Sequence, residues 1–341
     1  MILTIAVAVG IFLWRNLNHT GQVELKDFAL KNPKSITKIF YAPNNASIPY
    51  LEMEKDANGI WWVKNKKTRY KADTASIHDL LYYIMENLQV KNPVNDAALE
   101  AINREMALQA VKAQFYSGTT LVKTIYAGGP TYDQYGTYMY LPKEGNDKKH
   151  DRPCVVIVPG HNGFVTPYFN TDINNWRTPA LLDIKSNEIQ SLHIKWTENR
   201  TESFFIEKID GEFVLKNESG RQMNVNRNRL LSYLDMFTWV TREGGEIAGI
   251  NNNKESKSAL FASKPFFTID ILDNKGKRSV LNLYYRPITE ETYSQESKTG
   301  ELKTHEIETY WGVLGGTDEI WVVQDAILKN RMRKLSDFMS K

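Results

Sequence analysis

The chain has 341 residues, of which 42% are hydrophobic and 24% are charged, and its formal net charge is +3. This is the composition of an ordinary globular protein that is long enough for two domains with separate cores. The small net charge and the lack of a dense basic run with interleaved aromatic residues give no support for nucleic-acid binding. Cys154 is the only cysteine, so no disulfide forms within the chain.

The first 14 residues (MILTIAVAVGIFLW) carry no charged side chain. We predict that residues 1–14 form a truncated transmembrane anchor, because a helix of this length spans about 21 Å whereas a bilayer core measures about 30 Å. Two alternatives stay open. One is the apolar stretch of a cleaved signal peptide, although no basic region precedes it, and the other is a buried core helix. Residues 15–25 are polar and are expected to form a tether.

A strand–turn–strand pattern begins at residue 35. Residues 35–41 are rich in β-branched and aromatic side chains, and residues 50–55 alternate between apolar and polar, so both runs predict strands. An Asn-Gly pair at positions 58 and 59 then predicts a tight turn into a third strand at residues 60–63.

An amphipathic helix is expected to follow, capped by Asp73 or Thr74. The same order of strands, turn and helix recurs at residues 188–240, shifted by 152 or 153 positions, with Asn226 at the place of Asp73. This long repeat, present twice, predicts two tandem domains that arose by duplication. The apolar face of the first helix consists of Ile77, Leu80, Leu81, Ile84, Met85 and Leu88.

Each repeat continues with further strands, and in the first repeat a short helix capped by Asn95 or Asp96 precedes them. The charged loop at residues 143–152 is expected to be exposed, and the polar segments 241–264 and 289–305 are expected to be mobile loops. A helix is predicted to start near Asp325, with one apolar face made of Leu328, Met332, Leu335 and Met339.

The predicted fold class is therefore α+β. We expect two tandem duplicated domains, at residues 26–175 and 176–341, each an antiparallel β-sheet with a helix packed on one face. The second domain ends with the C-terminal helix, and the N-terminal membrane-anchor helix precedes the first domain.

No sequence motif identifies a catalytic, metal or cofactor site. The six histidines do not fall at metal-ligand spacing, and neither a nucleophile elbow, a phosphate-binding loop nor a dinucleotide fingerprint is present. Cys154 begins an apolar run, which predicts a buried and inert thiol. We predict no catalytic residue, no metal, no cofactor and no nucleotide.

The most unusual composition lies between the two repeats, in a stretch rich in tyrosine. Six of its residues are candidates for a partner or ligand surface. Three interpretations stay open: these residues line a seam between the domains with Arg177 at its end, they form a partner surface, or His161 acts as a base with Arg177 as an anion clamp. The six residues are Tyr132, Tyr135, Tyr138, His161, Trp176 and Arg177.

Several motifs together resemble a known family. These are the runs DFAL, SITKIF, YKAD, GGPTYDQYGTYMYL, PGHNGFVTPYF and NNWR. With the N-terminal apolar segment, the chain after Gly21 resembles the domain of unknown function 4340 family, and within it the membrane-anchored forms common in Bacteroidota. The resemblance implies a single-pass protein of the bacterial inner membrane with its folded domains in the periplasm. Some relatives are associated with transport-type or gliding-related membrane systems, and the family has no established catalytic residues.

The expected function is that of a non-enzymatic, membrane-anchored periplasmic protein. Its partners would be the membrane, through the N-terminal helix, and a protein of the cell envelope, for which it would act as accessory or scaffold to a transport or gliding-type membrane complex. The alternative is a periplasmic ligand-binding module, or an enzyme acting on an envelope polymer, that uses the inter-domain region.

Overall fold

The computed structural model describes residues 23–243, 249–288 and 304–339. The expected anchor at residues 1–14 lies outside the described residues, as do most of the tether and most of the loop expected at 289–305. Within the ranges that are described, no helix is both long and apolar enough to cross a lipid bilayer.

The chain divides into two compact units, residues 1–178 and residues 179–341. The boundary expected from the sequence lies between residues 175 and 176. Both units are built on antiparallel sheets with a few helices, as an α+β fold requires.

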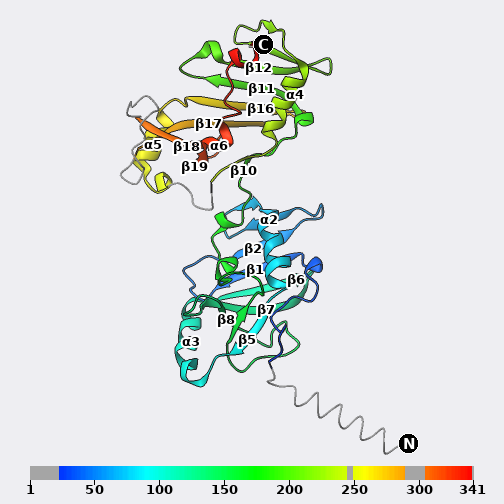
Figure 1. Cartoon of the computed structure of the whole chain (residues 1–341), viewed down its shortest axis with the longest axis vertical. Helices are drawn as coiled ribbons and strands as arrows, with labels where there is room; N and C mark the ends of the chain where they lie inside the picture. The colour runs from blue at the N-terminus through cyan, green and yellow to red at the C-terminus, as the bar shows by residue number, and fades with distance from the viewer. Residues whose placement is uncertain (1–22, 244–248, 289–303, 340–341) are drawn as a thin grey trace, which may run out of the picture. The chain divides into compact units, whose positions relative to one another are not determined.

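A nine-stranded antiparallel sheet forms the first unit (Figure 1). β1 lies inside the sheet, where Ile39 is opposite Met53 of β2 on one side and opposite Phe115 of β6 on the other. In spatial order the strands are β4 (Arg69–Lys71), β3 (Trp61–Lys64), β2 (Leu51–Lys55), β1 (Lys38–Pro43), β6 (Val111–Ser117), β7 (Thr120–Pro130), β8 (Thr137–Tyr140), β9 (Cys154–Ile157) and β5 (Gln89–Pro93).

The helices of the first unit begin at the caps expected from the sequence. Asp73 Oδ1 accepts a hydrogen bond from the N–H of Ala75 at 3.1 Å, and Asn95 Oδ1 accepts one from the N–H of Ala98 at 2.9 Å. The first helix changes from α to π geometry at Asp79, which its spacing did not predict. The helical segments are η1 (Pro33–Ser35), α2 (Thr74–His78), η2 (Asp79–Met85), α3 (Asp96–Gln109), η3 (Thr166–Phe169) and η4 (Ile173–Asn175).

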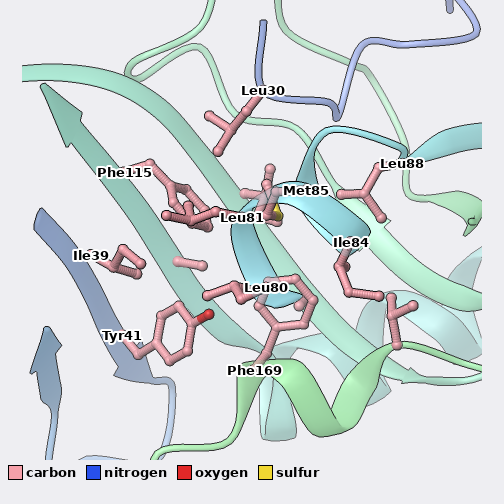
Figure 2. Close-up of a cluster of buried hydrophobic side chains, with 14 of the residues drawn as sticks. Leu30, Ile39, Tyr41, Leu80, Leu81, Ile84, Met85, Leu88, Phe115 and Phe169 are labelled. Carbon is pink, nitrogen blue, oxygen red and sulfur yellow. The ribbon is translucent and has the colours of Figure 1, made fainter. Parts of the chain in front are cut away.

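Helix η2 packs on the inner face of this sheet, over β1 and β6 (Figure 2). Ile39 and Tyr41 point inward from β1 and are fully buried, and Phe115 joins them from β6. The hydroxyl of Tyr41 donates to the Tyr168 carbonyl at 2.9 Å, so this buried polar group is satisfied. The helical face that the sequence predicts is confirmed, because each of its six residues is at most 3% exposed.

The outer face of the same sheet is covered in part by a second helix, α3. Ile102 and Met106 of α3 pack with Tyr126, Tyr138 and Tyr140, which alternate with inward-facing residues along β7 and β8. Helices therefore lie on both faces, and the expectation of a helix on one face only is wrong for this unit.

The second unit contains an eight-stranded antiparallel sheet and a two-stranded one. In spatial order the larger sheet contains β14 (Gln222–Met223), β13 (Glu212–Asn217), β12 (Phe204–Ile209), β11 (Ile189–Trp196), β16 (Phe267–Asp273), β17 (Arg278–Pro287), β18 (His305–Leu314) and β19 (Ile320–Gln324). The smaller sheet pairs β10 (Ala180–Leu182) with β15 (Val240–Thr241). The helical segments are η5 (Ser186–Glu188), η6 (Arg200–Glu202), α4 (Arg227–Asp235), η7 (Met236–Thr238), η8 (Gly249–Asn252), α5 (Lys254–Ala262), α6 (Asp325–Leu328) and α7 (Leu335–Met339).

The turns between the second and third strands of both sheets have the glycines that their sequences predict. Gly59 has a φ of +80° and Gly211 a φ of +85°, a left-handed conformation that glycine adopts at little cost. In the second unit the preceding Asp210 is also left-handed, with a φ of +49°. Both central residues thus have positive φ, the requirement of a type I′ turn.

The polar composition of residues 241–264 predicts a loop, but the described part of this segment contains a helix, α5. Asn253 caps α5 by accepting a hydrogen bond from the N–H of Ser256 at 3.0 Å. Leu260 of α5 packs with Ile250 on a cluster that includes Trp311 and Ile320 of the sheet. These strand residues alternate with the ones that face α4, so α5 covers the other face of the sheet.

The prediction of a single C-terminal helix from Asp325 is also wrong, because the segment forms two short helices, α6 and α7, with a break between them. Arg331 lies in the break, where its Nε donates to the Met236 carbonyl at 2.6 Å and its Nη2 to the Trp239 carbonyl at 3.1 Å. Its Nη1 donates to the Ile327 carbonyl in α6. The guanidinium thereby binds carbonyls at the ends of two short helices, η7 and α6, where helix ends leave carbonyls without intrahelical partners.

Leu80→Ala should lower the free energy of unfolding of the first unit by about 2–5 kcal/mol, because it empties a fully buried position under η2. Leu108→Ala, at a residue 71% exposed on α3, should change it by less than about 0.5 kcal/mol. Urea unfolding followed by circular dichroism measures both values. Equal unfolding midpoints for the two variants would contradict the packing described here.

Candidate functional site

Residues 131–136, the tyrosine loop, join β7 to β8 and are closed by hydrogen bonds from both ends. The N–H of Thr131 donates to the Gly136 carbonyl and the N–H of Gln134 to the Thr131 carbonyl, both at 2.8 Å. The buried Thr131 hydroxyl accepts from the N–H of Gly136 at 3.0 Å and donates to Asp133 Oδ1 at 2.5 Å. Asp133 Oδ1 also accepts from the N–H of Tyr135. The loop is therefore ordered by its own contacts.

The carboxylate inside the loop is held in its ionised form. The hydrogen bond from the Thr131 hydroxyl, together with the N–H of Tyr135, lowers the pKa of Asp133. Lys91 of β5 lies 3.9 Å from the same carboxylate. The Asp133 carboxylate is therefore available as a hydrogen-bond acceptor throughout the neutral pH range.

The tyrosine loop presents two aromatic side chains to solvent. Tyr132 is fully exposed and Tyr135 is 62% exposed. Tyrosine combines a large apolar ring with a hydroxyl and loses little conformational entropy on binding, which makes it frequent in protein interfaces. A loop that is already ordered reduces the entropic cost of binding further.

A second loop, residues 158–165, lies beside the tyrosine loop. A Cβ atom at Gly163 would be 4.0 Å from the Gln134 carbonyl oxygen, and the N–H of Val165 donates to Thr137 Oγ1 at 2.9 Å. This second loop carries His161, whose ring lies edge-on to Tyr83 and Tyr168 at centroid distances of 5.8 and 6.3 Å. Tyr83 is 45% exposed and extends the aromatic surface.

The other predicted residues lie elsewhere in the first unit. Tyr138 packs under α3, and Trp176 is 3% exposed, with its Nε1 donating to the Asn170 carbonyl at 2.8 Å. Arg177 lies over the ring of Tyr70 in β4, at 4.0 Å from the ring centroid. Five strand spacings of about 4.8 Å separate β4 from β7 across the sheet. The six residues therefore do not form one group: Tyr132 and Tyr135 lie at one end of β7, Trp176 and Arg177 lie near β4, Tyr138 packs under α3, and His161 belongs to the second loop.

A groove of about 1260 Å³ is the second notable feature of the first unit. Lysines and carboxylates line it together, from residues 24–31 and residues 141–151. Two of its lysines form ion pairs within the protein, Lys31 with Asp147 at 2.8 Å and Lys148 with Asp27 at 2.8 Å. The groove therefore carries positive and negative charges side by side.

One wall of this groove is fixed by a chain of buried hydrogen bonds. Asp27 Oδ2 lies 2.9 Å from His150 Nε2, and His150 Nδ1 lies 3.4 Å from the Cys154 thiol. With Nε2–H donating to Asp27, Nδ1 is left to accept the thiol proton, so both ring nitrogens are satisfied. Phe28, fully buried, packs edge-on against the same imidazole at 5.2 Å.

A thiol, an imidazole and a carboxylate in this order also occur in cysteine nucleophiles, but the thiol here is shielded. Cys154 is 0% exposed, and burial raises its pKa to about 12, whereas a nucleophilic cysteine needs a lowered pKa and access to substrate. The expected buried thiol is confirmed, and the cluster holds the chain segment at Asp27 against the sheet.

The loop at residues 143–152 is exposed in part, as expected, but this cluster buries His150 within it. His150 is 1% exposed, and only 22% of the Lys148 side chain is exposed. Asp27 precedes His150 by 123 positions, so no local pattern relates the two. The only signal in the sequence is a histidine near the end of an otherwise charged loop.

Neither a protein-family model, nor a curated protein sequence, nor a solved structure matches this chain. In the described ranges, no group of three or more histidine, cysteine or acidic side chains is arranged to hold a metal ion.

Asp27→Asn should lower the free energy of unfolding at neutral pH by about 1–3 kcal/mol, because it removes the charged partner of Lys148 and His150. Burial alone raises the pKa of Asp27, but hydrogen bonds from Lys148, the Glu24 N–H and His150 bring it below 3.8. A carboxylate with a lowered folded-state pKa stabilises above its unfolded-state pKa and loses that effect as the pH falls through the folded-state value.

The difference between wild type and Asp27→Asn should therefore be constant near neutrality and shrink only below about pH 4. Urea unfolding of both proteins from neutral pH down to about pH 3 tests this. A difference that disappears already between pH 7 and pH 5, or one that never shrinks in acid, would refute the role of the Asp27 carboxylate.

Thr131→Val should destabilise the first unit by about 1–3 kcal/mol, because the buried N–H of Gly136 loses its hydroxyl acceptor. Thr131→Ser keeps the hydroxyl and should retain most of the stability. Thermal unfolding of the two variants provides the comparison. Equal losses for both would mean that the methyl group, not the hydroxyl, holds the tyrosine loop.

Proposed function

We propose that this protein is a non-enzymatic binding module, held at the bacterial inner membrane by its N-terminal segment, with its folded units in the periplasm. In this proposal the tyrosine loop contacts a protein partner, and the chain acts as accessory or scaffold to a membrane complex of the envelope. The observation that carries the proposal is a loop ordered by its own hydrogen bonds that exposes Tyr132 and Tyr135.

The length of the tether supports a partner close to the membrane. Residues 15–22 separate the apolar N-terminal segment from the first described residue, Val23. A fully extended chain reaches about 3.5 Å per residue, so these eight residues bridge about 28 Å at most. A module tethered so closely would meet the periplasmic parts of membrane complexes more readily than distant soluble proteins.

The strand orders support the proposed duplication. Eight strands of the first sheet follow the order β4-β3-β2-β1-β6-β7-β8-β9, and the second sheet follows β14-β13-β12-β11-β16-β17-β18-β19. The two sheets therefore have the same strand order: adding ten to each strand number of the first series gives the second. Membership of the domain of unknown function 4340 family is likewise part of the proposal and rests on the sequence motifs alone.

We propose that the protein has no catalytic function because the side chains that could act as nucleophile, base or anion clamp are buried or packed against other residues. Cys154 is buried with a raised pKa, and Arg177 is stacked on Tyr70. His161 packs among Tyr83 and Tyr168, and neither His161 nor Arg177 lines the groove of the first unit. This arrangement favours a contact surface over the alternative of an envelope-polymer enzyme.

A pull-down from gently solubilised membranes tests the proposal with three forms of the full chain: wild type, the double variant Tyr132→Ala/Tyr135→Ala, and Leu108→Ala as an exposed apolar control. Both tyrosines project into solvent, so the double variant should fold like wild type. We expect it to recover at least one specific partner about tenfold less well, whereas Leu108→Ala recovers it normally. Recovery of the wild-type protein alone, or equal recovery by all three forms, would refute the proposal.

A further inference from the structure

The outermost strand at the β4 edge of the first sheet is paired with a further segment of the chain, whereas the corresponding strand of the second sheet, β14, is not paired in the described residues. In the first unit, β4 is the outermost strand and the segment at residues 176–178 runs along it. The N–H of Thr178 donates to the Lys71 carbonyl at 2.9 Å, and the N–H of Asp73 donates to the Trp176 carbonyl at 2.7 Å. Arg177 forms an antiparallel bridge with Ala72. The chain itself therefore closes this edge as an added strand.

In the second unit, β14 occupies the corresponding position, and among the described residues no segment pairs with its outer side. A shift of 153 positions places Val225 at the position of Ala72. Ala72 is 2% exposed and its N–H donates to the Trp61 carbonyl at 2.9 Å. Val225 is only half-buried, and within the described ranges it makes no such bond to Phe213. The edge of the second sheet is thus left open where the first is closed.

A hollow of about 450 Å³ lies at this open edge, between β13, β14 and the start of α4. Its lining mixes apolar and polar side chains, and an exposed ion pair between Arg227 and Glu212, at 3.0 Å, belongs to its polar part. The apolar lining residues are Phe213, Val214, Leu215, Met223, Val225 and Leu230.

We propose that the β14 edge binds an extended segment of a partner protein, which adds to the sheet as an antiparallel strand and places an apolar or aromatic side chain in the hollow. The first unit shows which kind of segment fits: residues 176–178 pair through their backbone, and the side chain of the first of them, Trp176, is buried against the core. By the same shift of 153 positions, Asn224 and Asn226 correspond to Lys71 and Asp73, whose backbone groups bind that segment. Strand addition of this kind uses backbone hydrogen bonds for affinity and a side-chain pocket for specificity.

This surface is independent of the tyrosine loop, because it belongs to the second unit. Loss of binding at one surface should leave binding at the other unchanged, and the two proposals therefore fail separately.

The test uses the full chain in detergent micelles and a displayed library of random ten-residue peptides. Val225→Lys places a charge in the hollow, and Asn228→Lys, at an exposed residue of α4 that does not line the hollow, is the matched control. Selection on wild type should enrich peptides with large apolar residues in extended sequences. Their affinity should fall by at least about tenfold for Val225→Lys, because the charge would be buried without a partner. Asn228→Lys should change it by less than about threefold, since its side chain lies in solvent outside the hollow.

Amide hydrogen exchange locates the bound peptide. Bound peptide should slow exchange at Asn224 and Asn226 and leave the amides of the tyrosine loop unchanged. If no peptides are enriched, or if the enriched peptides bind Val225→Lys as well as wild type, the proposal is overturned. If instead wild type dimerises and Val225→Lys does not, a second copy of the chain fills the edge, and the proposed occupant is wrong.

Discussion

Pairing between strands far apart in the sequence supports both units. In the first unit β1 lies between β2, which follows it directly, and β6, which comes only after two helices and three further strands along the chain. In the second unit β11 pairs with β12 and with β16 in the same manner. The loop closure needed for the distant pairing costs conformational entropy, which burial must offset. Ile39 and Tyr41, both fully buried, illustrate that offset, because they lie under η2 on a strand that is paired with β6.

This pairing also determines where function can reside. Since successive residues of a strand point to opposite faces, each sheet buries one face under η2 or α4 and part of the other under α3 or α5. The remaining accessible features are the loops at the strand ends and the outermost strands. The tyrosine loop uses the first of these places, and β14 offers the second.

Local features of the fold could be predicted from the sequence because they depend on neighbouring residues. The caps at Asp73 and Asn95, the left-handed Gly59 and Gly211, and the buried helical face all follow from short-range rules of spacing and turn chemistry. The exposure of two tyrosines follows in part, since a run of polar and aromatic residues with Pro and Gly favours a loop.

Features that depend on distant residues were not predicted. Helix α5 has few apolar residues, and what holds it is Leu260 packing on Trp311 of a strand much later in the chain. The break after α6 depends on Arg331 reaching the Met236 and Trp239 carbonyls. Arg177 was grouped with the tyrosines because it is near them in sequence, yet β-sheet pairing carries it to β4. Position along the chain is a poor guide to position across a wide sheet.

The orientation of the protein at the membrane is the claim on which the functional account depends most. Because Cys154 is buried and its pKa is raised to about 12, the native thiol should not react with a membrane-impermeant maleimide, and a single added cysteine gives a clear signal. Leu108→Cys, at an exposed position on α3, is a suitable site. The account predicts labelling in cells whose outer membrane alone has been permeabilised. Labelling only after the cytoplasm is opened would contradict a periplasmic module and would require partners in the cytoplasm.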